Sequence, residues 1–593
     1  MPRKSIHLSS AVLVLLTIAG CNTPRTTTYL KNRALYNAQH GRLDQARADL
    51  NDLYDCKLDG EPKALGKPAS EGEVYKDKHA LIWHTERSLL DLWELTYGAG
   101  RDHLSRARAL VEEFRAKDLV SGFTSAVAND TARDYIGEGF EHDYIDYLSA
   151  VEQLLVAQQA AERYLPGHIA LFVPELDPNG QRLPIAASEP TATDGSSQIP
   201  LDAIAEPNAA YDQAINAMRG LTEYTAKMTA DAAGGRRYHG NAYLHAMAAA
   251  VAMAHPKPLA SDLDYAEAML IRAAKLQEHS ATAFTGDPKF NWETRGMEGF
   301  IDDLRLLLAY RRGGAYLKEA LAERQTTVAD LQASGRLPKE DQAPVLLVNH
   351  VDYISKPEVL DIRMFTGTAP IATERETERG IEVETFNLGA VGFYAKGPGA
   401  DIVNHWGVLP VPGKLTEALG NGISVIGFAM PVHAPDRRVG ESPMAILLKS
   451  GEQNAAFHNL PIVDDPDAYA RATLKDEQPQ VLTKTLTRTL VKQIAAHVAS
   501  NEVRKQAGAI AGFFTQLVTS SAATASEIAD TRAITMLPNH VRAKLAFAPA
   551  GAFEAHVNDG WNERTIGRGD LRADRLTIIP FRSWTASLAE PKR

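Results

Sequence analysis

Apolar residues in the first half of the chain recur every three or four positions, which is the spacing of one helix face. The clearest run begins at Tyr29 and continues to Asp55, with leucines and small alanines on both sides of Gly41. Glycine readily adopts the left-handed conformations that end a helix. We therefore expect two helices that meet at Gly41 and pack along their leucine faces.

The same spacing returns at residues 88–114, 134–165 and 243–276. Small residues where two helices approach, with bulky residues elsewhere, resemble the tetratricopeptide repeat, although the units are irregularly spaced. In the run at 134–165, Tyr135, Tyr144 and Tyr147 form an aromatic stripe, which we interpret as core.

Pro166 is expected to end this helix. Residues 187–207 are rich in Pro, Ser and Thr and predict a disordered insertion. Helix is expected again from about 208 to 333, interrupted at Gly313 and Gly314.

The pattern changes to a period of two after Pro344, which is typical of strands. Strands are expected at residues 345–351, 381–386, 423–430, 541–547, 553–557 and 576–581, and long helices at 481–529. The run 423–430 is apolar throughout and predicts a central strand that ends before Pro431. The chain is therefore predicted to be multidomain. An all-α, tetratricopeptide-like domain at 29–335 precedes an α+β domain at 344–593 with a mostly antiparallel sheet.

The first twenty residues have the pattern of a secretory signal peptide, with Arg3 and Lys4 ahead of an apolar run at 11–19. The run is far shorter than the ~20 residues that span a membrane. It ends in Ile-Ala-Gly-Cys, which resembles the bacterial lipobox. That resemblance implies cleavage before Cys21, a lipid on its sulfur and a short tether at 21–28. The alternative is an ordinary secreted protein with a chance cysteine.

Composition and charge limit the partners and the cellular location that we expect for the protein. The 593 residues are 45% hydrophobic and 23% charged, as in soluble globular proteins. Cleavage would remove Arg3 and Lys4 and no acidic residue, so the net charge of −11 would become −13. An acidic body has no electrostatic reason to bind nucleic acid. Cys56 would have no disulfide partner. Asn22 is not the Asp that holds many lipoproteins in the inner membrane, so we expect the periplasmic face of the outer membrane.

Few residues suggest chemistry. The sequence has no HExxH, GxSxG, P-loop or CxxC motif, and the spacing of His239, His245 and His255 does not favour a metal site. We predict no metal and no cofactor. Asp530 and Arg532 lie two residues apart in an extended stretch. They are either a carboxylate–guanidinium pair in a cleft or, as we favour, a structural ion pair at a crossover between elements.

Three short sequence segments resemble those of a protein family. Gly367-Thr368-Ala369-Pro370, Leu486-Thr487-Arg488 with Lys492, and Asp530-Thr531-Arg532 before Leu537-Pro538 look like an uncharacterised family of proteobacterial lipoproteins with a tetratricopeptide-like N-terminal half. The resemblance covers most of residues 29–585 and implies no assigned reaction. Ile534 stands where the family has an aromatic residue, which weakens a catalytic role for that stretch.

The function expected from these features is a lipid-anchored envelope protein that acts as a non-enzymatic scaffold or adaptor for a protein partner, because degenerate helical arrays bind extended segments of other proteins. One alternative is an envelope hydrolase whose site is assembled from distant residues. Another is a glycan-binding protein, which would need exposed aromatic residues. Trp561 and Trp584 are the candidates for that role.

Overall fold

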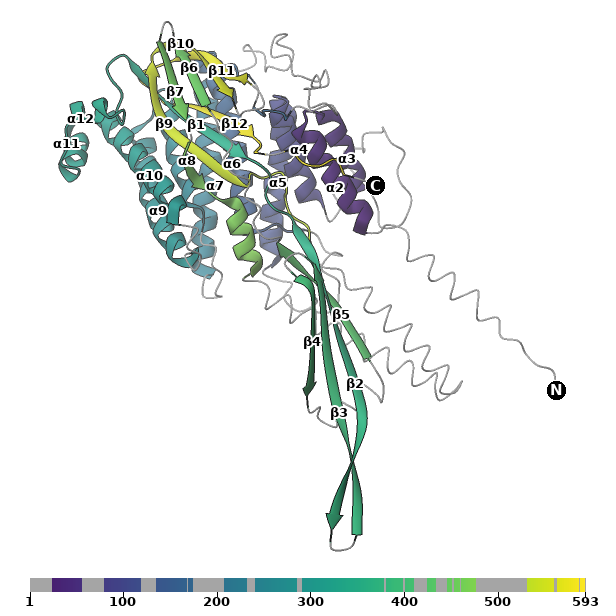
Figure 1. The fold of residues 1–593 in the computed structure, drawn as a ribbon. Coiled ribbons are helices and arrows are strands. Elements are labelled where there is room, and N and C mark those ends of the chain that lie inside the picture. Colours follow the sequence, from purple (N-terminus) through teal and green to yellow (C-terminus); the bar gives the residue numbers. More distant parts are fainter. Residues whose placement is uncertain are drawn as a thin grey trace.

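The structure is a computed structural model that describes most of the chain. The described residues are 24–55, 79–118, 135–167, 169–173, 207–231, 240–284, 291–377, 380–397, 400–409, 424–433, 445–450, 453–458, 460–475, 531–558, 563–585 and 587–591. Helices make up the first half and strands dominate the second (Figure 1). The predicted signal peptide, the insertion up to residue 206 and the long helices expected at 481–529 lie outside the described residues.

Helices occupy the segments that the hydrophobic spacing predicts, so the expected combination of helical and sheet regions is confirmed. Their bounds are α2 (Pro24–Gln39), α3 (Leu43–Asp55), α4 (Ala80–Trp93), α5 (Tyr97–Asp118), α6 (Gly139–Glu162), α7 (Pro207–Asp231), α8 (Ala242–Ala254), α9 (Ala260–Phe284), α10 (Asn291–Arg312), α11 (Gly314–Glu323) and α12 (Val328–Ala333). Gly41 lies between α2 and α3 with a φ of 74°. The tetratricopeptide-like character of the array stays a prediction.

Two helix boundaries differ from the expected ones. α6 begins after Glu138, whose side chain forms a capping box with Glu141, and it ends at Glu162. Arg163 then adopts a left-handed conformation with a φ of 50°, so the helix ends at Glu162, four residues before Pro166. Near the N-terminus, α2 begins at Pro24 and includes part of the predicted tether.

The strands form three four-stranded sheets with the orders β12-β1-β9-β8, β11-β10-β6-β7 and β4-β3-β2-β5. Only the pairing of β1 with β12 is parallel among these described ladders. The bounds are β1 (Gln342–Val351), β2 (Pro357–Thr377), β3 (Gly380–Gly397), β4 (Ala400–Leu409), β5 (Ser424–His433), β6 (Ala445–Ser450), β7 (Gln453–His458), β8 (Ile462–Asp464), β9 (His540–Pro549), β10 (Gly551–Asn558), β11 (Glu563–Leu571) and β12 (Thr577–Ser583). A short helix at 466–475 follows β8.

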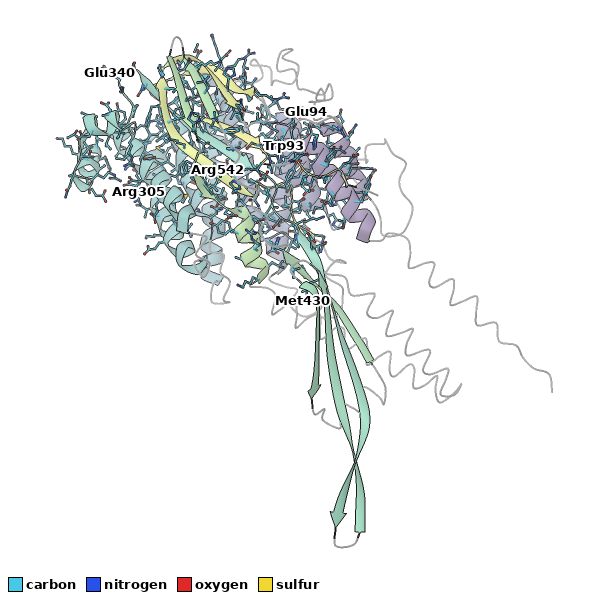
Figure 2. The ribbon with its side chains drawn as sticks, in the orientation of Figure 1. Trp93, Glu94, Arg305, Glu340, Met430 and Arg542 are labelled. Carbon is cyan, nitrogen blue, oxygen red and sulfur yellow. The ribbon has the colours of Figure 1, made fainter. Side chains whose placement is uncertain are left out.

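The third sheet, which we call the arm, leaves the body as a narrow projection (Figure 1). Met430 is 7% exposed and lies near the root of the arm (Figure 2). The strand expected at 423–430 is β5, but it occupies the end of the strand order, so the prediction of a central strand is wrong. Pro431 does not end it, because β5 continues to His433 and Pro431 pairs with Val359. A proline is tolerated at a sheet edge, where its missing N–H need not face a neighbour.

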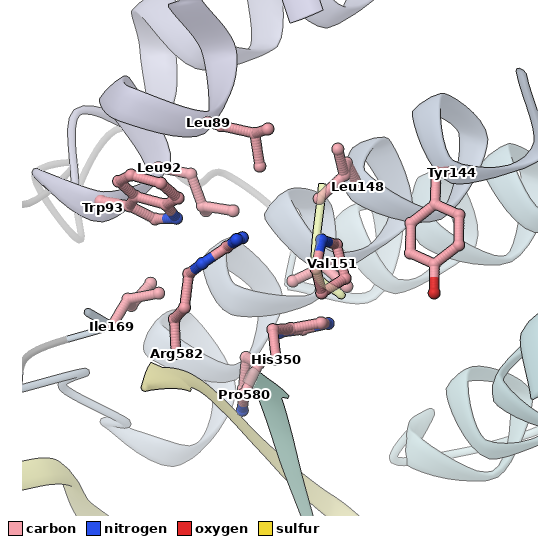
Figure 3. A pocket seen from close by; sticks show the side chains of 11 residues that line it. Leu89, Leu92, Trp93, Tyr144, Leu148, Val151, Ile169, His350, Pro580 and Arg582 are labelled. Carbon is pink, nitrogen blue, oxygen red and sulfur yellow. The ribbon is translucent and has the colours of Figure 1, made fainter. Parts of the chain in front are cut away.

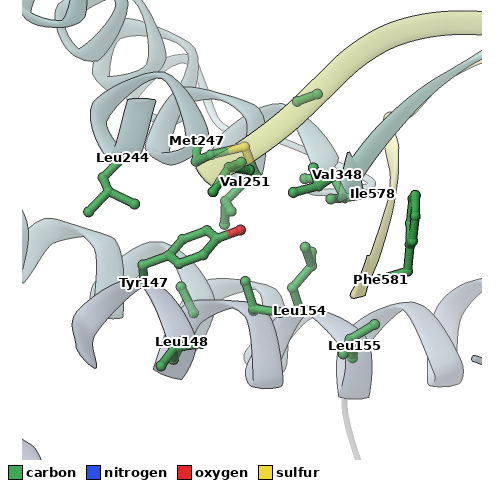
Figure 4. Close-up of a cluster of buried hydrophobic side chains, with 14 of the residues drawn as sticks. Tyr147, Leu148, Leu154, Leu155, Leu244, Met247, Val251, Val348, Ile578 and Phe581 are labelled. Carbon is green, nitrogen blue, oxygen red and sulfur yellow. The ribbon is translucent and has the colours of Figure 1, made fainter. Parts of the chain in front are cut away.

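One hydrophobic core runs from the helices into the two body sheets. Figure 4 shows part of it, where α6 and α8 meet the strands β1 and β12. The residues labelled there are Tyr147, Leu148, Leu154, Leu155, Leu244, Met247, Val251, Val348, Ile578 and Phe581. Residues from both sides of the segment 335–344 thus belong to one cluster. The expected division of the chain into two domains at this segment stays a prediction.

The segment after α6 joins the helices to both body sheets. Leu165 exchanges backbone hydrogen bonds with Arg568 of β11, at 2.7 and 3.0 Å. A few residues later, Leu171 donates to the carbonyl of Arg582 in β12 at 2.9 Å. Gln158 of α6 bonds both backbone groups of Ile578, at 2.8 and 2.9 Å, and so takes the place of a strand beside β12. A helix thereby covers an edge that would otherwise be open.

Close backbone contact at Gly296 gives a test of this helix-to-sheet packing. A Cβ atom at this position of α10 would lie 2.1 Å from the carbonyl oxygen of Ile462 in β8, whereas Gly299 on the same helix has nothing within 4 Å. We expect Gly296→Ala to destabilise the protein by about 1–3 kcal/mol through overpacking. Gly299→Ala should be neutral or stabilise by up to about 1 kcal/mol, because alanine favours helix.

Thermal melting of the two variants beside the parent protein measures the difference. Equal melting temperatures for the two variants would contradict the close approach of α10 and β8.

Candidate functional site

The stretch that the sequence singled out is fixed from the helical half by two buried glutamates. Glu86 of α4 accepts hydrogen bonds from the backbone N–H and the hydroxyl of Thr535, both at 2.9 Å. Glu141 of α6 accepts one from the backbone N–H of Ile534 at 2.8 Å. Both glutamates are 1% exposed. The loop 531–539 therefore docks onto helices whose glutamates lie 393 and 449 residues earlier in the chain.

The remaining bonds of these glutamates come from nearby groups. Glu86 also accepts from the hydroxyl of Tyr54 at 3.0 Å. The second oxygen of Glu141 accepts from Tyr135 at 2.6 Å and from the backbone N–H of Glu138 at 2.8 Å. Burial raises the pKa of Glu141, and these hydrogen bonds lower it in part. A carboxylate taken from water needs such donors, so the loop and the helices stabilise each other.

Arg532 belongs to this loop and contacts an aromatic ring of the helical half. Its guanidinium lies over the ring of Tyr135 at 5.4 Å from the centroid. Asp530 lies outside the described residues, so the ion pair stays a prediction. Lys31 of α2 donates to the carbonyl of Ala533 at 2.9 Å, which adds a third helix to the docking of the loop.

A second buried polar group joins α6 to β8. Tyr144 donates to Asp464 at 2.5 Å, and Asn241 donates to the same carboxyl group at 2.9 and 3.1 Å. Tyr144 and Asn241 are 0% exposed. Burial raises the pKa of Asp464 to about 7, although both donors lower it. Asp464 is thus an acid whose charge is costly inside the fold.

A neighbouring group of rings joins α6, α8 and β1. The hydroxyl of Tyr147 lies 2.9 Å from the hydroxyl of Tyr243 and 2.9 Å from Nε2 of His350. Tyr147 also packs edge-on against Tyr144, with 5.8 Å between ring centroids. Burial lowers the pKa of His350 to about 3, so its ring is neutral at pH 7. The imidazole therefore serves this group as a neutral hydrogen-bonding ring.

A cavity of about 20 Å³ lies beside these rings (Figure 3). Its lining consists of Leu89, Leu92, Trp93, Tyr144, Leu148, Val151, Ile169, His350, Pro538, Pro580 and Arg582. Polar side chains of Tyr144, His350 and Arg582 reach a space that is otherwise apolar. A volume of this size holds about one water molecule and not a metabolite.

Arg582 is the cation of this cavity. It is 2% exposed and lies over the rings of Trp93 and Tyr353, each 4.9 Å away. Its Nη2 donates to the carbonyls of Asp352 and Leu537, while its Nε has no hydrogen-bond partner among the described residues. Burial lowers the pKa of Arg582 to about 10, so the guanidinium stays charged at pH 7. Aromatic faces and carbonyl oxygens compensate for part of its lost hydration.

The chemistry of these groups is that of structural joints. A reactive site needs a base and a nucleophile aimed at a space that a substrate can enter. Here the carboxyl, phenol and imidazole groups face one another, and the space beside them admits about one water molecule. Hydrophobic spacing did identify the three tyrosines as core, which the burial of Tyr135, Tyr144 and Tyr147 confirms. It gave no sign of their polar partners.

The other candidates from the sequence have mixed outcomes. Cys21 and Trp561 lie outside the described residues. Trp584 is 1% exposed and packs against Trp93 with 6.0 Å between ring centroids, so it offers no exposed face to a glycan. His245 is fully buried and lies 2.8 Å from the carbonyl of Asn241. Among the described residues, no three histidine, cysteine or acidic side chains are grouped so as to hold a metal ion.

The two loop-docking glutamates should respond differently to the same substitution. In Glu141→Gln the amide NH2 would face an obligate backbone donor whichever way it turns, at Glu138 or at Ile534. We expect a loss of about 1–3 kcal/mol in stability. In Glu86→Gln the NH2 can donate to the hydroxyl of Tyr54, while the oxygen keeps Thr535, so the loss should stay below about 1 kcal/mol.

Chemical denaturation of the two purified variants measures both losses. A Glu86→Gln variant that is destabilised as much as Glu141→Gln would argue against this pattern of donors.

Asp464 should make the protein less stable as the pH rises. Its folded-state pKa of about 7 exceeds the ordinary value of 3.8, so the folded protein holds this proton more tightly than the unfolded chain. Stability is then lost as pH rises between these values, at about 1.4 kcal/mol per unit. Asp464→Asn mimics the protonated acid and should not show this loss.

The melting temperature of Asp464→Asn relative to the parent should therefore increase between pH 5 and pH 8. If the difference in melting temperature between the variant and the parent were the same at pH 5 and pH 8, the pKa of Asp464 would be ordinary.

Comparison with known proteins assigns neither a family nor a function to this chain. No family model, no curated protein and no solved structure matches the chain. No helix of the described part of the chain is long and apolar enough to cross a membrane. The resemblance to a lipoprotein family therefore stays a prediction, and function is argued from the fold and from the geometry above.

Proposed function

We propose that this protein is a lipid-anchored scaffold or adaptor at the periplasmic face of the bacterial outer membrane, and that it binds a protein partner through the arm. The arm carries the proposal because it is a sheet that leaves a fully packed body (Figure 1). In contrast, the buried polar groups described above bond helices and strands of the body to one another.

The length of the arm supports binding by strand addition. β2 and β3 pair from Asp361 with Lys396 as far as Thr377 with Gly380. β4 and β5 cover the part of this ribbon nearer the body, so the outer part is two-stranded among the described residues. A two-stranded ribbon is at best marginally stable alone in water. A partner that adds a strand would satisfy the backbone groups along its edges.

The anchor is proposed from the sequence at Cys21. α2 begins at Pro24, three residues later. Three residues reach about 10 Å at full extension, so a lipid on Cys21 would hold the helical body close to the bilayer. A body fixed at the surface with a projecting sheet is suited to contacting another envelope protein.

Site-specific photo-cross-linking in cells tests this function. A photoreactive amino acid at Thr373, in the outer part of the arm, should form a cross-link to a protein in the envelope. The same residue at Lys318, on the exposed side of α11, is the matched control and should form at least about tenfold less product.

Cys21→Ser should remove fatty-acid labelling and the arm cross-link together, whereas Cys56→Ser should preserve both. Fatty-acid labelling that persists in Cys21→Ser would exclude the proposed anchor. Equal products from Thr373 and Lys318 would exclude the arm as the binding element.

A further inference from the structure

We propose that the partner of each arm is the arm of a second copy of this chain, with β4 of one copy pairing antiparallel with β5 of the next. Copies joined in this way share one continuous sheet. The inference rests on the proposed function, because it identifies the protein that the arm binds. It is carried by the register of the arm, in which the two outer strands have equal length, share five rows and run in opposite directions.

The two outer strands have the same length. β4 and β5 are ten residues each, at Ala400–Leu409 and Ser424–His433. Each has one neighbour among the described residues, β3 for β4 and β2 for β5. Each therefore has a second side whose backbone N–H and C=O groups have no strand partner in the described part of the chain. Open edges of this length bind other strands unless something covers them.

The two outer strands also overlap in height along the arm, over five rows. Gly407 pairs with Val391, Val391 with Thr366, and Thr366 with Ser424. Four residues nearer the body, Val403 is linked through β3 and β2 to Phe428 in the same way. Every row between these two crosses all four strands. A neighbouring copy at the same height thus presents residues 424–428 of β5 opposite residues 403–407 of β4. Beyond these rows β4 extends toward the tip at Val408 and Leu409, and β5 extends toward the body at 429–433.

Strand direction agrees with this pairing. The ladders between β4 and β3, β3 and β2, and β2 and β5 are all antiparallel. β4 and β5 consequently run in opposite directions within one arm. When two copies stand side by side in the same orientation, β4 of one meets β5 of the other as an antiparallel pair. The alternation of directions then continues across the junction.

The anchor decides between this arrangement and a two-fold dimer. Pairing β5 with a second β5 in antiparallel fashion would turn one arm upside down relative to the other. Two copies held by lipids in the same leaflet cannot both accommodate that inversion. Pairing β4 with β5 keeps every copy upright, and such a head-to-tail contact closes into a ring or continues as a row.

Paired cysteines at matched height test the register. In a Cys56→Ser background that retains Cys21, the combination of His405→Cys with Ile426→Cys places one cysteine on each edge in the same row. Within one chain the two edges are three strand spacings apart, about 14 Å, which is too far for a disulfide. Any disulfide between them therefore joins two copies.

The matched control is Val403→Cys with Ser424→Cys, in which the two positions are four residues out of row, or about 14 Å along the strand. Mild oxidation of intact envelopes should convert the matched variant into a ladder of covalent dimers, trimers and larger species. The control should yield at least about tenfold less. Comparable ladders from both variants, or dimers from a variant with Ile426→Cys alone, would overturn the proposal.

A second measurement uses the protein without added cysteines. Mass photometry of the lipidated protein in detergent should show particles of three or more copies, and a monomer at all concentrations together with the absence of a ladder would overturn self-pairing. In that case a Thr373 cross-link to a different envelope protein would leave the proposed adaptor function standing. Melting of the reduced cysteine variants at the parent temperature shows that both fold.

Discussion

The contact between the helical half and the body sheets depends on one constraint, that polar side chains of the buried helix α6 need partners away from water. An unpaired buried donor or acceptor costs about 1–3 kcal/mol. Many of those partners come from the second half of the chain, namely the loop 531–539, β8, β1 and β12. The α6 residues that make these bonds are Glu141, Tyr144, Tyr147, Gln158 and Glu162. They explain why the helices and the sheets form one packed body.

The sequence predicts the parts of this fold that rest on local spacing. The helix pairs and the turn at Gly41 follow from runs of period 3.6 broken by glycine, and β1, β9 and β12 follow from runs of period two. The arm was foreseen only in fragments. Gly367 and Pro370 look like breakers, yet both lie inside the 21-residue strand β2. They are tolerated there because the outer part of the arm has open edges, which do not require every N–H.

For the loop 531–539, the sequence indicates the position of the stretch but not the side chains that bind it. The stretch around Arg532 stood out in the sequence, and residues 533–535 beside it are hydrogen-bonded to helices of the first half. Its anchors could not be found, because Glu86 and Glu141 lie hundreds of residues away and look like ordinary surface residues of helices. Charge and polarity normally indicate an exposed face. In α6 they indicate the opposite, since their partners are supplied by segments that no local pattern connects to them.

The place of β12 in the body has a consequence for how the protein matures. It pairs in parallel with β1, and soon after it Leu588 bonds the side chain of Gln39 at 2.7 Å. Gln158 and Glu162 of α6 therefore lack their partners in β12 until Thr577 and Ile578 have been synthesised. A chain that lacks these residues would expose that helix and its neighbours to proteases and chaperones. The body can therefore finish folding only when its last strand is present, and truncated products should be degraded.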